Sequence, residues 1–210
     1  MKFVSFYKAL FVSAVAILLA YLQGKSQETS FSDVHSLYWQ TGINTGNYNV
    51  GFSSDLNYIY KSRYSLQVGY SGFFKHPDSE PNDYSTGLVT LFSFGLERVY
   101  DQVHNWNLLV GHLIPLNHSE TLRLHVRAGG AYSRRLIPIN WAPVQGAGIT
   151  ENYGYDYLVK TGPALVFNVE LQWAYLQFLG HSLDAVLMMR DNDVFVGIGI
   201  SGSLGLLRPR

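Results

Sequence analysis

The stretch Asp193-Val-Phe-Val-Gly-Ile-Gly-Ile-Ser-Gly-Ser-Leu-Gly-Leu-Leu207 decides the fold. Apolar residues recur at every second position from Val194 to Leu206, with Gly202 completing the row, and the intervening positions are mainly Gly and Ser. In an extended chain these two sets lie on opposite faces. A strand with one broad apolar face and one small, uncharged face is typical of a transmembrane β-barrel. Such a strand crosses the bilayer in about 9–11 residues, so this stretch is long enough.

The same stretch contains Gly197-Ile-Gly199-Ile-Ser-Gly202, which matches the G-x-G-x-x-G pattern of dinucleotide-binding proteins. That pattern requires a helix that opens at the glycines and an acidic residue about 20 positions further on. Here the two-residue alternation continues through the glycines. Small residues on a crowded interior face explain them better, and we expect no nucleotide cofactor.

The first residues have the pattern of an export signal. Lys2 and Lys8 give a positive start, and an apolar run follows from Ala9 to Leu22. This run is shorter than the roughly 20 residues that a spanning helix needs. We expect a signal peptide over residues 1–26, cleavage before Gln27 and a barrel over residues 27–210; an uncleaved anchor is the alternative. No other apolar run approaches that length, so insertion would use strands.

Composition supports the same fold class. Charged residues make up 14% of the chain and aromatic residues 15%, and there are 20 glycines. The formal net charge is zero, which argues against a nucleic-acid partner. The chain has no cysteine, which excludes a disulfide scaffold and a thiol site.

Alternation predicts about nine strands, and bacterial single-chain barrels use even numbers, so we expect eight to ten strands in an all-β, antiparallel up-and-down transmembrane barrel. The expected strands cover 35–46, 49–61, 63–75, 84–99, 105–114, 121–134, 157–175, 182–190 and 193–207. A soluble barrel would turn its apolar face inward and carry many Lys and Glu residues outside. The less apolar face is instead mainly Gly, Ser, Asn and Gln, which favours a membrane barrel with a narrow lumen.

Residues 135–156 break the alternation with Pro138 and Pro143. We expect a long surface loop here, extracellular in a membrane barrel, with Trp141, Tyr153 and Tyr155 as candidates for binding an external ligand or partner. Pro163 falls within an expected strand. Because proline cannot donate to a ladder, we place it at the rim or in a bulge.

Several charged residues share the less apolar face of the expected strands. Unpaired charge is costly in a narrow lumen, so these residues should pair into a network. Rings of charge that line a pore or gate are the alternative. The predicted members are Glu97, Arg123, His125, Arg127, Lys160, Glu170, Asp184 and Arg190.

The signal, the alternating strands and the Gly-Ile-Gly-Ile terminal strand make the chain resemble small outer-membrane β-barrel proteins of Gram-negative bacteria, of the flavobacterial type. The resemblance implies an exported protein in contact with outer-membrane lipid. A barrel of about eight strands has an interior just wide enough for side chains to fill, so we expect a largely filled lumen and a structural or surface-interaction role. A small pore and a lipid-A-modifying enzyme are the alternatives. His118-Ser119-Glu120 has the residue types of such an enzyme, but neighbours in one turn do not form a triad. We therefore expect no enzyme.

Overall fold

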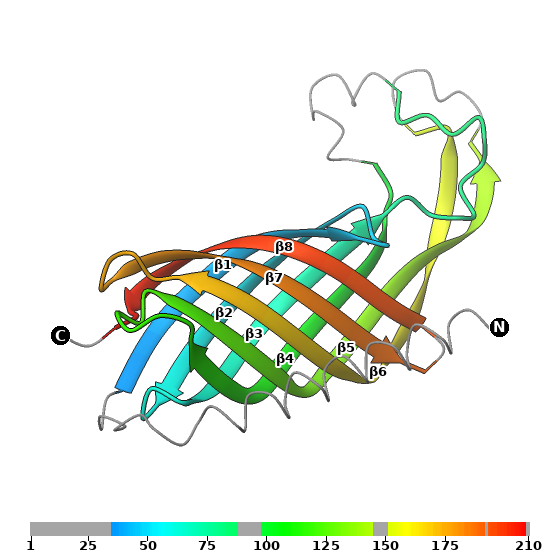
Figure 1. The fold of residues 1–210 in the computed structure, drawn as a ribbon. Coiled ribbons are helices and arrows are strands. Elements are labelled where there is room, and N and C mark those ends of the chain that lie inside the picture. The colour runs from blue at the N-terminus through cyan, green and yellow to red at the C-terminus, as the bar shows by residue number, and fades with distance from the viewer. Residues whose placement is uncertain (1–34, 88–97, 145–150, 192, 209–210) are drawn as a thin grey trace, which may run out of the picture. The chain divides into compact units, whose positions relative to one another are not determined.

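The computed structural model describes residues 35–87, 98–144, 151–191 and 193–208, which form a closed β-barrel of eight strands (Figure 1). Each strand pairs antiparallel with the next, and β8 pairs with β1. The expected up-and-down architecture is therefore confirmed, with eight strands. They are β1 (His35–Gly46), β2 (Val50–Tyr60), β3 (Tyr64–Lys75), β4 (Asp101–Pro115), β5 (Leu122–Pro143), β6 (Tyr153–Trp173), β7 (Leu179–Arg190) and β8 (Asp193–Leu206). The predicted signal peptide lies outside the described residues, among which no helix is long and apolar enough to cross a membrane.

The expected strand over residues 84–99 is not a strand of the barrel wall. β3 pairs directly with β4, from Tyr64 opposite His112 to Lys75 opposite Asp101, so no other strand lies between them. Residues 84–87 and 98–100 belong to the connection, and residues 88–97 lie outside the described part of the chain.

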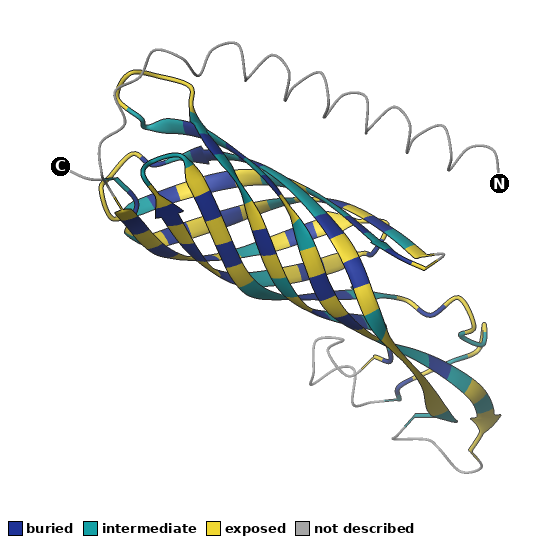
Figure 2. Cartoon of the chain, turned by 90° about the horizontal axis from the view of Figure 1, so that it is seen from below, coloured by how far each residue is buried: buried dark blue, intermediate teal, exposed yellow. Residues whose placement is uncertain are grey.

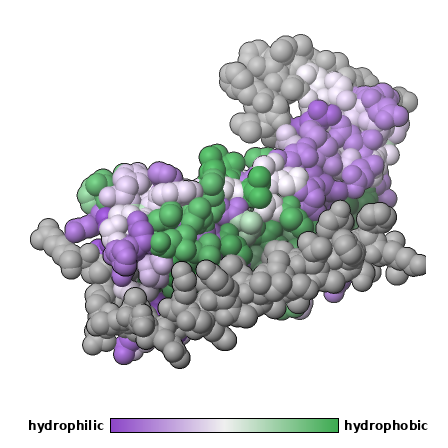
Figure 3. Space-filling model, viewed as in Figure 1, coloured by the Kyte–Doolittle hydropathy of each residue, from purple (hydrophilic) through white to green (hydrophobic). Residues whose placement is uncertain are grey.

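The two faces of the wall follow the alternation in the sequence. Buried and exposed residues alternate along much of the wall, most regularly in β1 and β8 (Figure 2). Ile43 and Ile198, for example, are 63% and 64% exposed, whereas Asn57 and His125 are fully buried. Most apolar side chains of the wall therefore point outward and most polar ones inward, and hydrophobic residues gather over the middle of the barrel (Figure 3).

Two bands of outward aromatic residues flank this apolar surface. At one end Tyr64 packs against His112, and Tyr175 against His181. At the other end Trp106 lies between Tyr70 and Tyr132. Aromatic side chains in this arrangement are typical of the two interfaces of a lipid bilayer.

The connections at the two ends differ in length. At the end we call the short-turn end, the strands are joined by residues 61–63, 116–121 and 174–178. Lys61 and Ser62 have φ values of 53° and 51°, and Arg63 N donates to Tyr60 O at 3.1 Å. Two positive φ values define a tight hairpin turn that matches the twist of the strands. At the other end, the loop end, residues 76–100 and 144–152 form the longest connections.

The prediction of a loop over residues 135–156 is wrong in its secondary structure. β5 and β6 remain paired beyond the barrel, from Leu136 opposite Val159 to Pro143 opposite Tyr153, with one register shift between Ile139 and Ala142. β5 leaves β4 after Leu136. The result is a two-stranded projection, here called the extension (residues 137–144 and 151–163), at the loop end (Figure 1).

Both strands of the extension lack a neighbour on their outer edges, which explains why it tolerates prolines. β6 begins to pair with β7 only at Leu165. Pro163 lies just beyond that point and opposite Tyr132 of β5. A residue without an N–H group breaks no ladder where a strand has an open edge, and the predicted rim position of Pro163 is correct.

Candidate functional site

The interior of the barrel is organised in layers between the short-turn end and the loop end. A buried polar network comes first, followed by a small cavity, an apolar layer and a charged mouth. The interior is one candidate site, and the extension outside the barrel is the other.

An ion pair forms the centre of the buried network. Arg127 Nη1 of β5 lies 2.5 Å from Glu170 Oε2 of β6, and neither side chain is more than 1% exposed. Arg127 also donates to Asn168 Oδ1 at 3.1 Å and to His125 Nδ1 at 2.8 Å. Because a guanidinium only donates, His125 Nδ1 accepts. The Nδ1 atom of His125 therefore carries no proton, and Nε2 donates to Gln172 Oε1 at 3.3 Å.

Amide side chains tie this ion pair to the far wall. Gln40 Nε2 of β1 donates to Glu170 Oε1 at 3.1 Å and to Ser182 Oγ of β7 at 2.9 Å. Asn57 Nδ2 of β2 donates to Gln40 Oε1 at 3.1 Å. The network therefore joins five strands across the lumen. Its side chains occupy the space that would have to be filled with water in an open pore.

Arg123 closes the interior towards the short-turn end. Its Nη1 donates to Leu207 O at 2.7 Å and its Nη2 to Gln172 Oε1 at 2.5 Å. Beside it, a compact apolar cluster fills the same end of the barrel. The cluster consists of Tyr38, Ile59, Leu113, Ala174 and Leu207.

A layer of large apolar side chains, here called the apolar belt, crosses the lumen nearer the loop end. The rings of Phe73 and Phe195 lie 4.0 Å apart, and Tyr48 packs edge-on against both. The belt consists of Tyr48, Phe73, Val103, Leu109, Ala131, Ala164, Val166, Met188 and Phe195. Sequence reasoning missed the belt, although pairs of successive large apolar residues, such as Phe73-Phe74, indicate an apolar residue on the inner face.

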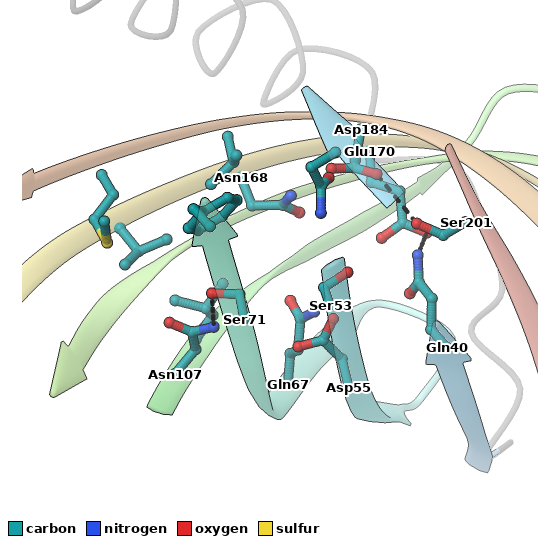
Figure 4. A pocket seen from close by; sticks show the side chains of 16 residues that line it. Gln40, Ser53, Asp55, Gln67, Ser71, Asn107, Asn168, Glu170, Asp184 and Ser201 are labelled. Atoms are coloured by element: carbon teal, nitrogen blue, oxygen red, sulfur yellow. Dashed lines mark hydrogen bonds between the residues drawn. The ribbon is translucent and has the colours of Figure 1, made fainter. Parts of the chain in front are cut away.

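The belt separates two cavities. The inner cavity has a volume of about 50 Å³ and lies between the belt and the buried network (Figure 4). Asp55, Gln67, Asp184 and Glu170 line it. The mouth cavity, of about 140 Å³, lies on the other side of Phe73 and Met188, which line both.

Ion pairs surround the mouth cavity. Arg135 binds both carboxylate oxygens of Asp101, at 3.0 and 2.6 Å, and donates to Asp193 Oδ2 at 2.7 Å. Lys75 Nζ lies 2.7 Å from Asp78 Oδ2 in the adjacent loop, and this hydrogen bond lowers the pKa of the Asp78 carboxyl. Buried Arg190 donates to Ser133 Oγ at 3.4 Å.

The structure distributes the predicted charged residues that it describes over four places. Arg123, His125, Arg127 and Glu170 meet in the buried network. Asp184 lies beside it in the inner cavity, where it accepts from Ser201 Oγ at 3.1 Å.

Arg190, in contrast, lies at the mouth, separated from that network by the apolar belt. Lys160 must be corrected: it is exposed on the extension, opposite Arg135, because β6 continues beyond the barrel. Glu97 lies outside the described residues. The predicted set did not include Asp55. Because Asp55 lies two residues before Asn57 on the same strand, its inward direction could have been predicted from the alternation.

The aromatic candidates Trp141, Tyr153 and Tyr155 lie on the extension. Trp141 and Tyr153 contact residues 76–87, whereas Tyr155 packs against Trp141 and Tyr157 of the extension itself. Tyr153 OH donates to both carboxylate oxygens of Asp83, at 2.8 and 3.0 Å. This hydrogen bond raises the pKa of the Tyr153 hydroxyl, so its proton is retained. The Trp141 ring lies 5.2 Å from that of Tyr84 and 5.3 Å from that of Tyr155.

Backbone and amide contacts complete the junction between the extension and the 76–87 loop. Asn152 exchanges hydrogen bonds with Ser85 and donates to Asp83 O at 2.8 Å. Ser79 Oγ donates to Pro138 O at 2.9 Å and accepts from Trp141 Nε1 at 3.2 Å. The loop and the extension therefore form one folded surface.

Within the described ranges, no group of three or more His, Cys, Asp or Glu residues is arranged to hold a metal ion. In the turn that carries His118, Ser119 and Glu120, the Ser119 Oγ lies 3.1 Å from Thr121 Oγ1.

Neither a protein-family model nor a curated protein sequence matches the chain. Among solved structures, it is similar to the N-terminal β-barrel domain of Pseudomonas aeruginosa OprF, with a TM-score of 0.51 and 9% identity over 81% of this chain and 97% of that one. The chain has the fold of a small outer-membrane β-barrel. Ail of Yersinia pestis, in complex with the heparin analogue sucrose octasulfate, matches with a TM-score of 0.45 and 9% identity, over 81% and 96% of the two chains. At these identities the similarity extends to the fold alone.

Proposed function

We propose that this protein is a structural or surface-interaction barrel of the bacterial outer membrane, exported with cleavage of its signal peptide. Its wall holds the extension and the 76–87 loop at the cell surface, and its lumen does not conduct. The observation that carries the proposal is the contrast between a barrel interior closed by two layers and a folded surface that projects from one end.

The support for a membrane location is the outward face of the wall. It is apolar over the middle of the barrel and bounded by two aromatic bands. In water this surface would be a large apolar patch, which soluble monomers avoid.

The support for a surface-interaction role is the composition of the projecting part. Exposed Tyr157, Leu158 and Val159 lie on the strand of the extension whose outer edge has no neighbour. Aromatic and apolar side chains on a rigid hairpin give contact area at a low cost in conformational entropy. An external macromolecule or glycan is therefore a more suitable partner than a solute that passes through the lumen.

Neither alternative function has a comparable basis. A pore needs an open lumen, and here buried side chains cross it at two levels. An enzyme needs a nucleophile, a base and an orienting group in one site. We accordingly propose no catalytic activity.

Single cysteines test the proposed location and orientation, because the chain has no cysteine of its own. Asp156→Cys places a thiol on the extension, and His118→Cys places one in an exposed turn at the short-turn end. On intact cells of a Gram-negative host, a membrane-impermeant maleimide should label only Asp156→Cys. His118→Cys should react after the outer membrane is permeabilised.

Labelling of both positions on intact cells, or of neither, would contradict the proposed topology. Recovery of the protein in the soluble periplasmic fraction would contradict the location. A shift in gel mobility between unheated and boiled samples gives an independent check that each variant has folded.

A further inference from the structure

The inner cavity is lined by two carboxyl groups that no basic side chain of the described residues pairs with. Arg127 balances Glu170 and is committed to Glu170, Asn168 and His125. Asp55 and Asp184 also line the cavity, and neither forms an ion pair with any described residue. The other buried cation on this side of the apolar belt, Arg123, is bound to Leu207 and Gln172.

Two buried carbonyl oxygens at the same cavity have no hydrogen-bond donor. Asn44 Oδ1 and Gln67 Oε1 are unpaired, although the two residues are only 4% and 6% exposed. Both residues line the inner cavity. An unpaired buried acceptor is costly, so such a group calls for a donor or a cation.

Two glycines of the wall leave room for three of these oxygens. A Cβ added at Gly199 would collide with Asn44 Oδ1 and lie 2.8 Å from Asp184 Oδ1, so both oxygens lie over this residue. A Cβ at Gly69 would similarly collide with Asp55 Oδ1. Figure 4 shows Asp55 and Gln67 on one side of the cavity, and Asp184 with Glu170 on the other.

We propose that the inner cavity binds one calcium ion, between Asp55 and Asp184, with Asn44 and Gln67 supplying carbonyl oxygens. Water could satisfy the carbonyl oxygens, whereas a divalent cation would satisfy them and would also pair with both carboxyl groups in their ionised form. Oxygen ligands without nitrogen or sulfur select a hard cation. Two carboxylates match a divalent charge.

The size and irregular lining of the cavity favour calcium over magnesium. A volume of about 50 Å³ holds one ion with one or two waters, since a water molecule takes about 30 Å³. Magnesium demands near-ideal octahedral geometry and retains several waters, whereas calcium accepts six to eight oxygens in flexible arrangements. The apolar belt closes the cavity on one side, so we expect the ion to enter during folding and to exchange slowly.

The test uses the full mature chain, refolded in detergent with CaCl₂ and freed of unbound ion by gel filtration. Bound metal is then measured by mass spectrometry. Wild type should retain about one calcium ion per chain. Asp55→Asn and Asp184→Asn should each retain at least about tenfold less, because affinity depends on the charge of the ligands. Asp78→Asn removes a carboxylate that is 86% exposed, and it should retain the wild-type amount.

Thermal unfolding, followed by the heat-dependent gel shift, separates a binding role from a structural one. Calcium should raise the unfolding temperature of wild type and of Asp78→Asn, and EDTA present during refolding should remove the effect. Asp184→Asn should not respond to calcium, yet without calcium it should be at least as stable as wild type, because a buried unbalanced charge has been removed.

Wild-type chain that retains no calcium and gains no stability from it would overturn the proposal, whether or not the variants fold. Equal calcium in wild type and in the double variant Asp55→Asn/Asp184→Asn would also overturn it, because the ion would then lie elsewhere. Retention of magnesium but not calcium under the same conditions would overturn the choice of ion.

Discussion

The barrel wall and the extension are built from the same two strands, but different forces stabilise them. Within the wall, β5 and β6 each have neighbours on both sides, and their inward residues belong to a buried network. In the extension the same strands have only each other, and hydrogen bonds to the 76–87 loop hold them in place. In the wall, strand pairing is reinforced by burial on both faces; in the extension it depends on a few polar and aromatic contacts.

This difference has consequences for stability and for function. Substitutions in the wall should affect unfolding of the whole barrel, because the closed ladder and the network are cooperative. Substitutions in the extension should change local opening and recognition. Binding surfaces are commonly carried by such locally stabilised elements on a rigid scaffold.

The largest expected effect comes from breaking the buried ion pair. Arg127→Ala leaves Glu170 buried without its partner and should lower the free energy of unfolding by about 3–5 kcal/mol. Urea unfolding in lipid vesicles measures this change. The double variant Arg127→Met/Glu170→Leu should recover much of the loss, because no uncompensated charge remains. If Arg127→Ala unfolds like wild type, the network does not stabilise the wall.

A smaller effect is expected from placing a charge on the outside, and a matched pair compares the two regions. Ile198→Arg should cost about 2–4 kcal/mol if this position faces the middle of the bilayer. Val159→Arg, at an exposed site of the extension, should change stability by no more than about 0.5 kcal/mol. Equal costs at the two sites would contradict the assignment of the wall to lipid and of the extension to water.

The smallest effect should follow from Tyr153→Phe, which removes only the hydroxyl that binds Asp83. The loss of stability should be small, and it should appear as local opening rather than as barrel unfolding. Hydrogen exchange should become faster over residues 76–87 and 151–157, with no change in β7 or β8. Faster exchange throughout the barrel would mean that the extension and the wall unfold together.

The same contrast explains what could be predicted from sequence. Alternation around Ile198 predicted the wall, because one face meets lipid and the other a polar lumen. The alternation predicted no strand near Pro138 and Pro143, because neither face of the extension lies against lipid or the lumen. The open edges of the extension also tolerate proline, which is usually read as a sign of a loop. The pairing there depends on contacts with residues far away in the chain, such as Tyr153 with Asp83, which no local pattern encodes.

The interior could be predicted only in part for a similar reason. The alternation was enough to predict that Arg123, His125 and Arg127 point inward. The pairing of β5 with β6 then places Glu170 opposite His125. The position of each residue along the barrel axis could not be predicted, because it depends on the register between neighbouring strands. Arg190 therefore shares the inward face but lies on the other side of the apolar belt.

Single-channel recording in planar lipid bilayers tests the central claim most directly. Purified, folded protein should insert without producing stable ion-conducting openings, because the buried network and the apolar belt fill the lumen at two levels. Large, long-lived openings from wild-type protein would contradict a closed barrel that carries a surface for interaction, and would establish a pore instead.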